Sequence, residues 1–578
     1  TKFFDMKFKY KLLSEFDNLD EDIDGVLINS ENFGALNLLQ DRYKEQVKTV
    51  YIDPPYNTGN DGFLYNDTYQ HSSWMSFMYD RLSLGRELMS EDGVIFSSIG
   101  DEEYCNLDSV QQQVFGGFNR IDTTARISKT ASNLGTHFAS SIDYLLTFAK
   151  KIDKLKSFRA DVDESLYKKV EKDGPRKGDK YRDDIALYQS SLKDVRPGQK
   201  YFIDCPDGSK VIPPCKILDE VQREGEKRWR WTRPRYLKDI DLLVFKETKS
   251  SPLLDENGNQ SKWNIYTKSY LSDRQEEGTK PRNFFDGFIN RKGADLLKKM
   301  GIDFTFSKPI ELISFLLKIT NTKTTTLDFF AGSGTTGHSV INLNREDDGQ
   351  RKYILIEMGE YLEAITKPRI QKVIYTDSWK EGKPTTKNGI SQIFKYFKLE
   401  SYEDTLNNLE FKRTKEQEET LGLYPQAKED YMINYSLDVE SQASLLNIDT
   451  FKTPFYYKLK IATSSVGETQ DTNIDLVETF NYLLGLVVEQ TRMEKGYLWV
   501  SGKNLKNEKI LVIWRDLEKV EKPLEEFVKR WDIEKKDDID FDLVYINGDN
   551  NLLNIKKEEA LFKVKLIEQE FKDLMFGE

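Results

Sequence analysis

Several features are scarce in this sequence, and each scarcity excludes a class of protein. Its 578 residues include only three cysteines and three histidines. Cys105, Cys205 and Cys215 are too few for a disulfide framework and lack the paired spacing of a zinc site, so we expect no metal centre. The sequence has no apolar run of about 18 residues or more and no signal-like start, so we expect a soluble, cytoplasmic protein without a membrane partner.

An excess of positive charge is also absent, because the formal net charge is −12. Net charge governs long-range steering, whereas nucleic acids bind to local patches. One such patch, Arg223–Lys249, has nine Lys/Arg against five Asp/Glu and interleaves cations with tryptophans. Arginine suits guanine edges and phosphates, and tryptophan can stack on bases, although an exposed strand with a solvated charged face explains the pattern equally well. The candidate DNA-contacting residues are Arg228, Trp229, Arg230, Arg233 and Arg235.

Apolar runs and periodic stretches alternate along most of the chain. Strands are predicted at Val26–Asn29, Val47–Ile52, Val94–Ile99, Ser141–Phe148, Thr325–Phe330 and Lys352–Ile356. Helices are predicted at Phe33–Tyr43, Glu102–Val114, Gly293–Met300 and Ile310–Ile319, and from Ser73 and Thr335 onward. This alternation favours an α/β fold with a doubly wound, mostly parallel sheet.

The alternation is interrupted once, and this interruption predicts the domain organisation. Between about residues 150 and 280, dense mixed charges and Pro/Gly turns replace it. Near the C-terminus, strands Tyr497–Val500, Ile510–Trp514 and Leu543–Ile546 with helices Phe480–Val488 and Pro523–Trp531 predict a smaller α/β domain. The predicted parts are 1–150, 151–280 as an insertion, 281–400 and 401–578.

A short motif, Asp53-Pro54-Pro55-Tyr56, follows the strand that ends at Ile52. The prolines fix their own φ angles and restrict the residues before them, so the loop is stiff. The Asp53 carboxylate and the Pro54 carbonyl offer two acceptors beside the Tyr56 ring, which together match the NH2 group and flat ring of a nucleobase. A simple turn is the alternative, because Asp-Pro and Pro-Pro are common turn sequences.

A second motif runs from Asp328 to Thr335 and places a glycine turn between a strand and a helix. Gly332 and Gly334 permit positive φ angles and close backbone approach, and the amides of the helix face a ligand beyond the strand. A phosphate loop is disfavoured, because His338 stands where that motif requires lysine.

A dinucleotide-binding loop competes with an adenosyl-binding loop at this motif. Gly337 supplies the third glycine of the dinucleotide pattern, and Glu357 is an acid about 20 residues further on that can bind ribose hydroxyls. Glu357 fits NAD and an adenosyl cofactor equally well. Only the Asp53 motif favours the adenosyl cofactor.

Together these motifs resemble those of DNA amino-methyltransferases of the β order, in which Asp-Pro-Pro-Tyr precedes Phe-x-Gly-x-Gly. More narrowly, the chain resembles the modification subunits of type III restriction–modification systems. The resemblance covers most of the chain in patches, and the joint order and spacing of its motifs are specific. The segments that carry it include 51–59, 74–82, 92–99, 306–312, 328–336 and 478–483.

The resemblance implies a Rossmann-like methyltransferase sheet with a target-recognition domain at 151–280. It implies that S-adenosylmethionine is the cofactor and that N6 of a flipped-out adenine accepts the methyl group. The catalytic residues would be Asp53, Pro54, Pro55 and Tyr56. Glu357 would take the ribose, Lys308 would lie near the methionine end, and Glu31 stands where the family has an aspartate against the cofactor adenine. The remaining cofactor residues would be Asp328, Phe330, Ala331, Gly332, Ser333, Gly334 and Thr335.

Other functions stay open. N4 of cytosine presents the same NH2 group, although Asp rather than Ser before Pro-Pro favours adenine within the family. A non-catalytic DNA-reading subunit with a vestigial cofactor fold is a second alternative, and an NAD enzyme is a distant third. The expected partners are double-stranded DNA, a second copy of the chain in a homodimer and a restriction subunit with helicase and nuclease activity.

Overall fold

The chain divides into two compact units in this computed structural model. The first unit comprises Thr1–Ser157 and Arg282–Glu578, and the second comprises Phe158–Pro281, on which the predicted insertion falls. The structure describes residues 5–58, 69–130, 137–138, 140–196, 198–217, 222–358, 361–399, 451–462, 469–520, 541–550, 556–558, 561–562 and 564–576.

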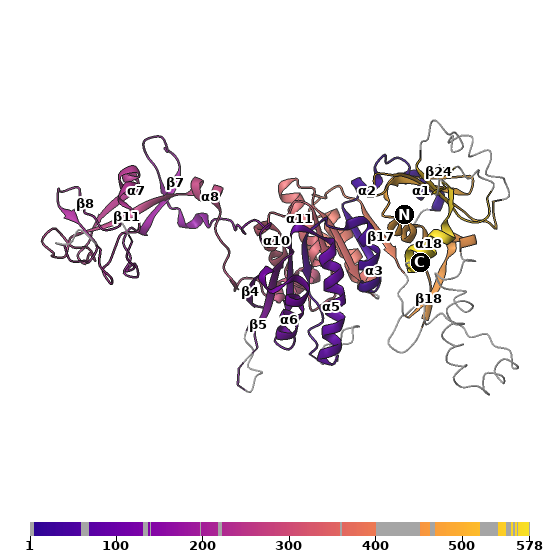
Figure 1. Ribbon diagram of the computed structural model, residues 1–578, viewed down its shortest axis with the longest axis horizontal. Coiled ribbons are helices and arrows are strands. Elements are labelled where there is room, and N and C mark those ends of the chain that lie inside the picture. The colour runs from indigo at the N-terminus through magenta and orange to yellow at the C-terminus, as the bar shows by residue number, and fades with distance from the viewer. Residues whose placement is uncertain are drawn as a thin grey trace. The chain divides into compact units, whose positions relative to one another are not determined.

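The first unit is built on a nine-stranded sheet of order β12-β4-β5-β3-β2-β13-β14-β1-β17 (Figure 1). Every pairing is parallel except the two made by β5. The predicted α/β fold with a mostly parallel sheet is therefore confirmed. The strands are β1 Gly25–Asn29, β2 Val47–Ile52, β3 Met89–Ile99, β4 Arg120–Ile127, β5 Ile142–Ala149, β12 Phe284–Phe285, β13 Thr325–Asp328, β14 Lys352–Glu357 and β17 Phe394–Lys398.

The helices of this unit pack in two groups, as expected for a sheet that is wound on both sides. Helix α5 packs against α3 and α6, whereas α11 packs against α10 and α12. The central strands are apolar almost throughout, because both of their faces are covered. The helices are α1 Met6–Leu13, α2 Leu19–Asp22, α3 Asn32–Leu38, α4 Gln40–Tyr43, α5 His71–Leu88, α6 Tyr104–Phe115, α9 Asn290–Lys299, α10 Ile310–Ile319, α11 Thr335–Asp347 and α12 Lys367–Tyr375.

Two strands of the nine-stranded sheet differ from their predicted bounds by more than one residue. Strand β13 ends at Asp328 rather than Phe330, because the Asp328 carboxylate accepts a hydrogen bond from the Phe330 amide and turns the chain. Strand β3 begins at Met89 rather than Val94, since Met89 already pairs with Val47 of β2. The predicted helix Phe33–Tyr43 is divided into α3 and α4.

The predicted helix Phe480–Val488 is wrong at its C-terminal end, and the predicted helix Pro523–Trp531 lies outside the described residues. Helix α16 (Leu476–Leu483) stops because Gly485 has a φ of 60° and ends the helix, so Val488 already lies in the next strand. That strand opens a second sheet of order β20-β21-β22-β23-β26. Its strands are β20 Val487–Glu494, β21 Tyr497–Lys503, β22 Lys509–Arg515, β23 Leu543–Ile546 and β26 Val564–Leu566.

The nine-stranded sheet and the five-stranded sheet of the first unit share one hydrophobic core. The Phe397 ring of β17 lies 5.1 Å from the Tyr482 ring of α16, measured between centroids. Phe480 of the same helix packs edge-on against Trp514 of β22 at 5.8 Å. The remaining elements of this unit are β15 Trp379–Lys380, β16 Lys383–Pro384, β18 Lys458–Ala462, β19 Thr469–Asn473, β24 Lys556–Glu558, β25 Leu561–Phe562 and α18 Ile567–Phe576.

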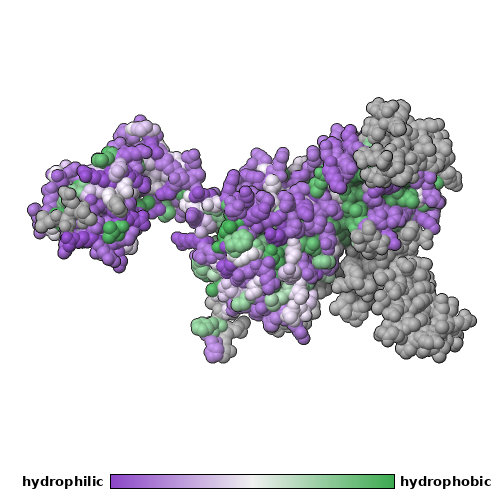
Figure 2. Space-filling model, viewed as in Figure 1, coloured by the Kyte–Doolittle hydropathy of each residue, from purple (hydrophilic) through white to green (hydrophobic). Residues whose placement is uncertain are grey.

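The second unit has its own small core and an antiparallel sheet of order β10-β11-β7-β6. Trp229, Leu253 and Ile265 are fully buried in this core. On the face seen in Figure 2 the surface of this unit is mostly hydrophilic. Its elements are β6 Lys169–Val170, β7 Lys180–Ala186, β8 Ile203–Asp204, β9 Lys210–Val211, α7 Arg233–Lys238, β10 Leu243–Glu247, β11 Trp263–Tyr270 and α8 Leu271–Glu277. In the described residues of the whole chain, no helix combines the length and hydropathy needed to cross a membrane.

Candidate active site

A cavity of about 180 Å³ lies where β2, β13 and β14 end, at the carboxyl edge of the sheet. Ligands of doubly wound sheets bind at this edge. The two sequence motifs therefore meet although they are far apart in the chain. The lining residues are Tyr51, Asp53, Pro54, Pro55, Tyr56, Asn290, Phe304, Phe306, Lys308, Asp328, Phe330, Ala331, Gly332, Ser333, Thr335, Glu357 and Tyr361.

Hydrogen bonds to the backbone of the Asp53 loop and to the side chain of Asn57 fix the loop in place. The indole nitrogen of buried Trp74 donates to the Pro55 carbonyl at 3.0 Å. Asn57 has a φ of 59°, and its side chain donates to buried Glu103 at 2.7 Å and to the Tyr69 carbonyl at 2.9 Å. These contacts, with the two prolines, give the loop a defined conformation.

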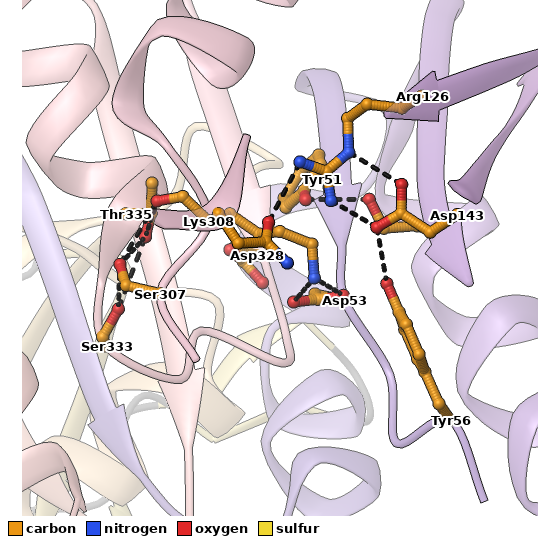
Figure 3. A network of polar contacts seen from close by, with 12 residues as sticks. Tyr51, Asp53, Tyr56, Arg126, Asp143, Ser307, Lys308, Asp328, Ser333 and Thr335 are labelled. Carbon is orange, nitrogen blue, oxygen red and sulfur yellow. Dashed lines mark hydrogen bonds and ion pairs between the residues drawn. The ribbon is translucent and has the colours of Figure 1, made fainter. Parts of the chain in front are cut away.

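Asp53 is paired with a lysine from the opposite half of the cavity. The Lys308 ammonium lies 2.6 Å from Asp53 Oδ1 and 5.1 Å from the centre of the Tyr56 ring (Figure 3). The Lys308 side chain is 8% exposed. The predicted catalytic aspartate and the predicted cofactor lysine are therefore in direct contact.

Tyr56 is oriented by a second ion pair. Its hydroxyl donates to Asp143 Oδ2 at 3.4 Å, and Arg126 binds both oxygens of that carboxylate, with Nε at 2.8 Å from Oδ1 (Figure 3). Arg126 also donates to Asn290, which lines the cavity. Arg126 is only 1% exposed, so the ion pair is rigidly packed.

Asp328 is a buried carboxyl group at the base of the glycine turn. It accepts hydrogen bonds from the Thr336 hydroxyl at 2.5 Å and from the Phe330 amide at 3.1 Å. Burial raises the pKa of Asp328 to about 7, and the negative charge of Asp53 adds to the rise. The neutral form is therefore populated near neutral pH.

Glu357 binds the glycine turn from the end of β14. Its carboxylate accepts from the Gly332 amide at 2.6 Å and from the Met358 amide at 3.0 Å. Burial raises the pKa of Glu357 to about 7. A Cβ atom added at Gly332 would meet no atom closer than 4.0 Å, so this glycine leaves open space above the turn.

Two predicted cofactor residues do not line the cavity. Gly334 has a φ of 79°, and a Cβ atom there would lie 2.8 Å from Thr366, so this glycine shapes the turn. Glu31 caps helix α3 through the Gly34 amide and forms an ion pair with Arg81 at 2.5 Å. The carboxylate of Glu31 is thus held by protein groups outside the cavity lining, and the geometry gives no support to its predicted contact with the cofactor.

Two predicted DNA-contacting residues in the second unit are corrected by their burial. Arg228 is 4% exposed and donates to Asp194 and Gln199, and Trp229 is fully buried with its indole nitrogen bonded to the Tyr201 carbonyl. Neither side chain reaches the surface. Trp229 and Trp231 are core residues, which neither the DNA contact nor the exposed strand considered from the sequence included.

The other arginines of the patch are accessible. Arg233 and Arg235 are exposed on α7, and Arg230 is half-buried. The Arg235 guanidinium lies 4.7 Å from the centre of the Trp231 ring and pairs with Asp239 at 3.3 Å. The DNA contact of these three residues stays a prediction.

Several lining residues were missed by sequence reasoning. Phe306 opens segment 306–312, one of the segments that resemble the methyltransferase family, so the sequence alone could have indicated it as a site residue. Phe304 and Tyr361 meet edge-on at 5.7 Å and carry no motif. In the described residues, no group of three or more His, Cys, Asp or Glu is placed to hold a metal ion.

A parallel sheet with a glycine turn and an acid at the ends of neighbouring strands defines the Rossmann-like class of α/β proteins. Residues 47–368 match the family described as DNA methylase. Because this match covers more than half of the chain, the chain belongs to that family.

Three individual proteins are similar to this chain over more than half of its length. The chain is 29% identical to the Mod subunit of the type III restriction-modification enzyme EcoPI of Escherichia phage P1, over 64% of this chain and 62% of the relative. It is 28% identical to the EcoP15I Mod subunit of Escherichia coli, over 58% of each chain. It is also 29% identical to the type II methyltransferase M.KpnI of Klebsiella pneumoniae, over 63% of this chain and 88% of the relative.

The chain spans 53–62% of the length of three type III Mod subunits that it matches, from phage P1, Salmonella typhimurium and Escherichia coli. Among solved structures, the cytosine-N4-specific PvuII DNA methyltransferase is 12% identical. That alignment covers 61% of this chain and 91% of the other, with a TM-score of 0.30.

Proposed function

We propose that this protein transfers a methyl group from S-adenosylmethionine to N6 of an adenine that is rotated out of duplex DNA. One observation carries the proposal: the Asp53 loop and the Gly332 turn line the same cavity. Membership of the DNA methylase family and similarity to type III Mod subunits support it. A reacting amine and a methyl donor have to meet in one place, and this cavity offers groups suited to each.

The residues around the glycine turn fit the proposed cofactor. Gly332 leaves open space, Glu357 offers a carboxylate at the strand end, and Phe330 offers an aromatic face. When bound, S-adenosylmethionine supplies an electrophilic methyl group on a sulfonium. The residues that would hold it are Asp328, Phe330, Ala331, Gly332, Ser333, Thr335 and Glu357.

The Asp53 loop would hold the acceptor. Asp53 and the Pro54 carbonyl accept hydrogen bonds from the exocyclic NH2, and the Tyr56 ring stacks on the base. These contacts offset a base-flipping cost of about a few kcal/mol. Because Lys308 is bonded to Asp53, the incoming amine has to share that carboxylate with the lysine or displace it. Positioning accounts for most of the acceleration, and Asp53 orients N6 without acting as a strong base.

We further propose that the 158–281 unit reads the DNA sequence, with Arg230, Arg233 and Arg235 in contact with DNA. The exposure of Arg233 and Arg235 supports this assignment. A restriction subunit is the proposed partner, since the type III relatives are Mod subunits of restriction-modification enzymes. The homodimer expected from the resemblance stays a prediction.

A methyl-transfer assay tests the proposal. The purified chain is incubated with unmethylated bacterial genomic DNA and isotopically labelled S-adenosylmethionine, and the DNA is digested to nucleosides for mass spectrometry. Labelled N6-methyldeoxyadenosine is expected, and the Asp53→Ala chain serves as the inactive control. Long-read sequencing of DNA from cells that express only this chain then gives the recognised sequence.

The same assay separates the alternatives. Labelled N4-methyldeoxycytidine would change the target base and leave the mechanism intact. A folded chain that binds DNA and S-adenosylhomocysteine but transfers no label to DNA with a complete set of sequence contexts would be the non-catalytic reading subunit.

A further inference from the structure

Arg369 of helix α12 is a fully buried guanidinium beneath the glycine turn. Its Nη1 donates to Ser333 Oγ at 2.8 Å, to Thr335 Oγ1 at 3.1 Å and to Ser307 Oγ at 3.3 Å. Its Nε donates to His338 Nδ1 at 3.1 Å. The cation thus faces a layer of three hydroxyl groups on one side and an imidazole on the other.

No carboxylate in the described part of the chain forms an ion pair with Arg369, and its Nη2 has no hydrogen-bond partner there. Burial lowers the pKa of Arg369 to about 9, whereas burial and the charge of Arg369 hold the pKa of His338 well below its usual value. By contrast, buried Arg126 pairs with Asp143 and buried Arg42 with Asp20.

An isolated buried charge is strongly unfavourable unless an opposite charge or hydrogen bonds compensate for it. The neutral hydroxyls and the Ser333 carbonyl, which accepts from Nη1 at 3.1 Å, compensate for part of the charge of Arg369. The remaining charge of Arg369 requires an anion near the hydroxyl layer, and this anion is not part of the described protein. A ligand in the cavity is the available source.

The hydroxyl layer forms part of the cavity wall. Ser333 and Thr335 line the cavity, and Ser307 is bonded to both of them. Figure 3 shows these three residues grouped together, separated from Tyr56 by Lys308 and Asp328. A hydroxyl that accepts a hydrogen bond from a cation is polarised and donates more strongly to an acceptor on its other side.

We propose that Arg369 is a positioning residue that acts through the hydroxyls of Ser333 and Thr335 to hold the methionyl carboxylate of S-adenosylmethionine. The inference rests on the proposed function and specifies how the cofactor is oriented. The carboxylate is the anionic group of this cofactor, and Lys308, the other cation of the cavity, is already paired with Asp53. With the carboxylate at the hydroxyl layer, the sulfonium end is directed toward the Asp53 side of the cavity.

Two ligands that differ only in the carboxylate test this inference. S-adenosylhomocysteine carries the group, and S-adenosylthiopropylamine has hydrogen in its place. Dissociation constants for both are measured by calorimetry with the wild-type chain and with Arg369→Gln. The wild type is expected to prefer the carboxylate-bearing ligand, and Arg369→Gln is expected to lose about tenfold or more of that preference, as for the loss of a charge-assisted contact. Arg369→Lys, which keeps a cation, is expected to regain part of it.

Arg345→Gln is the matched control, because Arg345 is a partly buried arginine of α11 that bonds to the Val373 carbonyl and to Asn342, away from the hydroxyl layer. This variant should keep the wild-type preference.

If Arg369→Gln does not fold, the Ser333→Ala/Thr335→Val variant decides instead, since it removes the hydroxyls and keeps the guanidinium. Equal weakening of both ligands would assign Arg369 a purely structural role and overturn the inference, as would a wild type without preference. A wild-type chain that binds neither ligand would contradict the proposed function itself.

Discussion

At the scale of single residues, the cavity is defined by charges that are incompletely matched. Asp53 and Lys308 neutralise each other, whereas Asp328 and Glu357 are carboxyl groups whose pKa burial raises to about 7. Arg369 carries a cation without a described acid. A ligand that brings complementary charge or hydrogen bonds would stabilise Asp328, Glu357 and Arg369 further, and perturbed pKa values of this kind concentrate at functional sites.

The first prediction concerns Asp53. Asp53→Ala removes one acceptor of the proposed amine and leaves the hydrogen bonds of the glycine turn in place. We expect retained binding of S-adenosylhomocysteine and DNA, with methyl transfer reduced by a factor of about 100 or more, the scale of losing a positioned catalytic group. Single-turnover transfer and calorimetry measure the two effects. Asp92→Ala, which breaks the Lys48–Asp92 pair outside the cavity, is the control and should transfer methyl groups normally. Turnover of Asp53→Ala within tenfold of wild type would refute the assigned role.

The second prediction concerns the pH dependence of stability. The folded pKa of Asp328 is about 7 against an ordinary 3.8, so its contribution to stability is complete below about pH 3.8 and is lost as the pH rises through about 7. Asp328→Asn stays neutral, accepts from the Phe330 amide and donates to the Thr336 hydroxyl. The ligand-free variant should therefore melt about 2–6 °C above wild type at pH 8, and the difference should shrink toward pH 5.

Asp92→Asn is the control for this pH series, because hydrogen bonds to Lys48 and Ser90 lower the pKa of Asp92 although burial opposes them. Its effect should have the opposite sign. A difference in melting temperature between Asp328→Asn and wild type that stays constant from pH 5 to pH 8 would show that Asp328 is ionised in the folded protein over this range.

At the scale of elements, local sequence determined where most strands of the nine-stranded sheet lie, but not always where they end. Strand β2 was predicted at its observed bounds, because an apolar run followed by two prolines leaves little choice. Helix α16 was extended too far, because the apolar pattern continues beyond Gly485 although the backbone reverses there. The burial of Trp229 shows the same limit, since a strand-like alternation does not say which face meets the core.

The third prediction belongs to the glycine turn. Gly332→Trp places a large side chain in the open space above the turn, so it should fill the cavity and abolish binding of S-adenosylhomocysteine. Gly332→Ala is the matched control, because it has the same left-handed φ of 50° but leaves most of the cavity free. The alanine variant should be destabilised by about 1 kcal/mol and should still bind the ligand. An unchanged dissociation constant for the tryptophan variant, measured by calorimetry, would contradict the placement of the cofactor.

At the scale of the whole molecule, a buried ion network joins the N-terminal segment to the nine-stranded sheet and to the five-stranded sheet of the first unit. Asp20 of α2 pairs with Arg42 at 2.8 Å and with Lys395 of β17 at 2.9 Å, and it accepts from the Val488 amide of β20 at 2.7 Å. Burial alone would raise the pKa of Asp20, but Lys395 and Arg42 outweigh it and hold the pKa below its ordinary value. The C-terminal sheet is thus part of the same stable body as the cavity.

The fourth prediction tests this network. Asp20→Asn leaves two buried cations without their shared acid and should destabilise the protein by about 3 kcal/mol. Urea unfolding at pH 7 measures the loss, with exposed Asp22→Asn of the same helix as a control that should change stability by less than about 0.5 kcal/mol. The same pair of proteins gives a pH test. Because the folded pKa of Asp20 is lowered, the difference in unfolding free energy between wild type and Asp20→Asn should be complete above pH 3.8, the ordinary pKa of the group, and should disappear as the pH falls below it. Equal stability of the two variants would mean that the network is solvated.

The sequence by itself determined the order of the elements, the stiff Asp53 loop and the glycine turn, because these follow from local properties: apolar periodicity, the fixed φ of proline and the missing Cβ of glycine. Only the tertiary structure decided that Lys308 meets Asp53 across 255 positions, that Asp143 orients Tyr56 and that Arg369 lies under the cavity without an acid. Such contacts depend on how distant segments pack against one sheet, and no local pattern in a single sequence encodes which of them will meet.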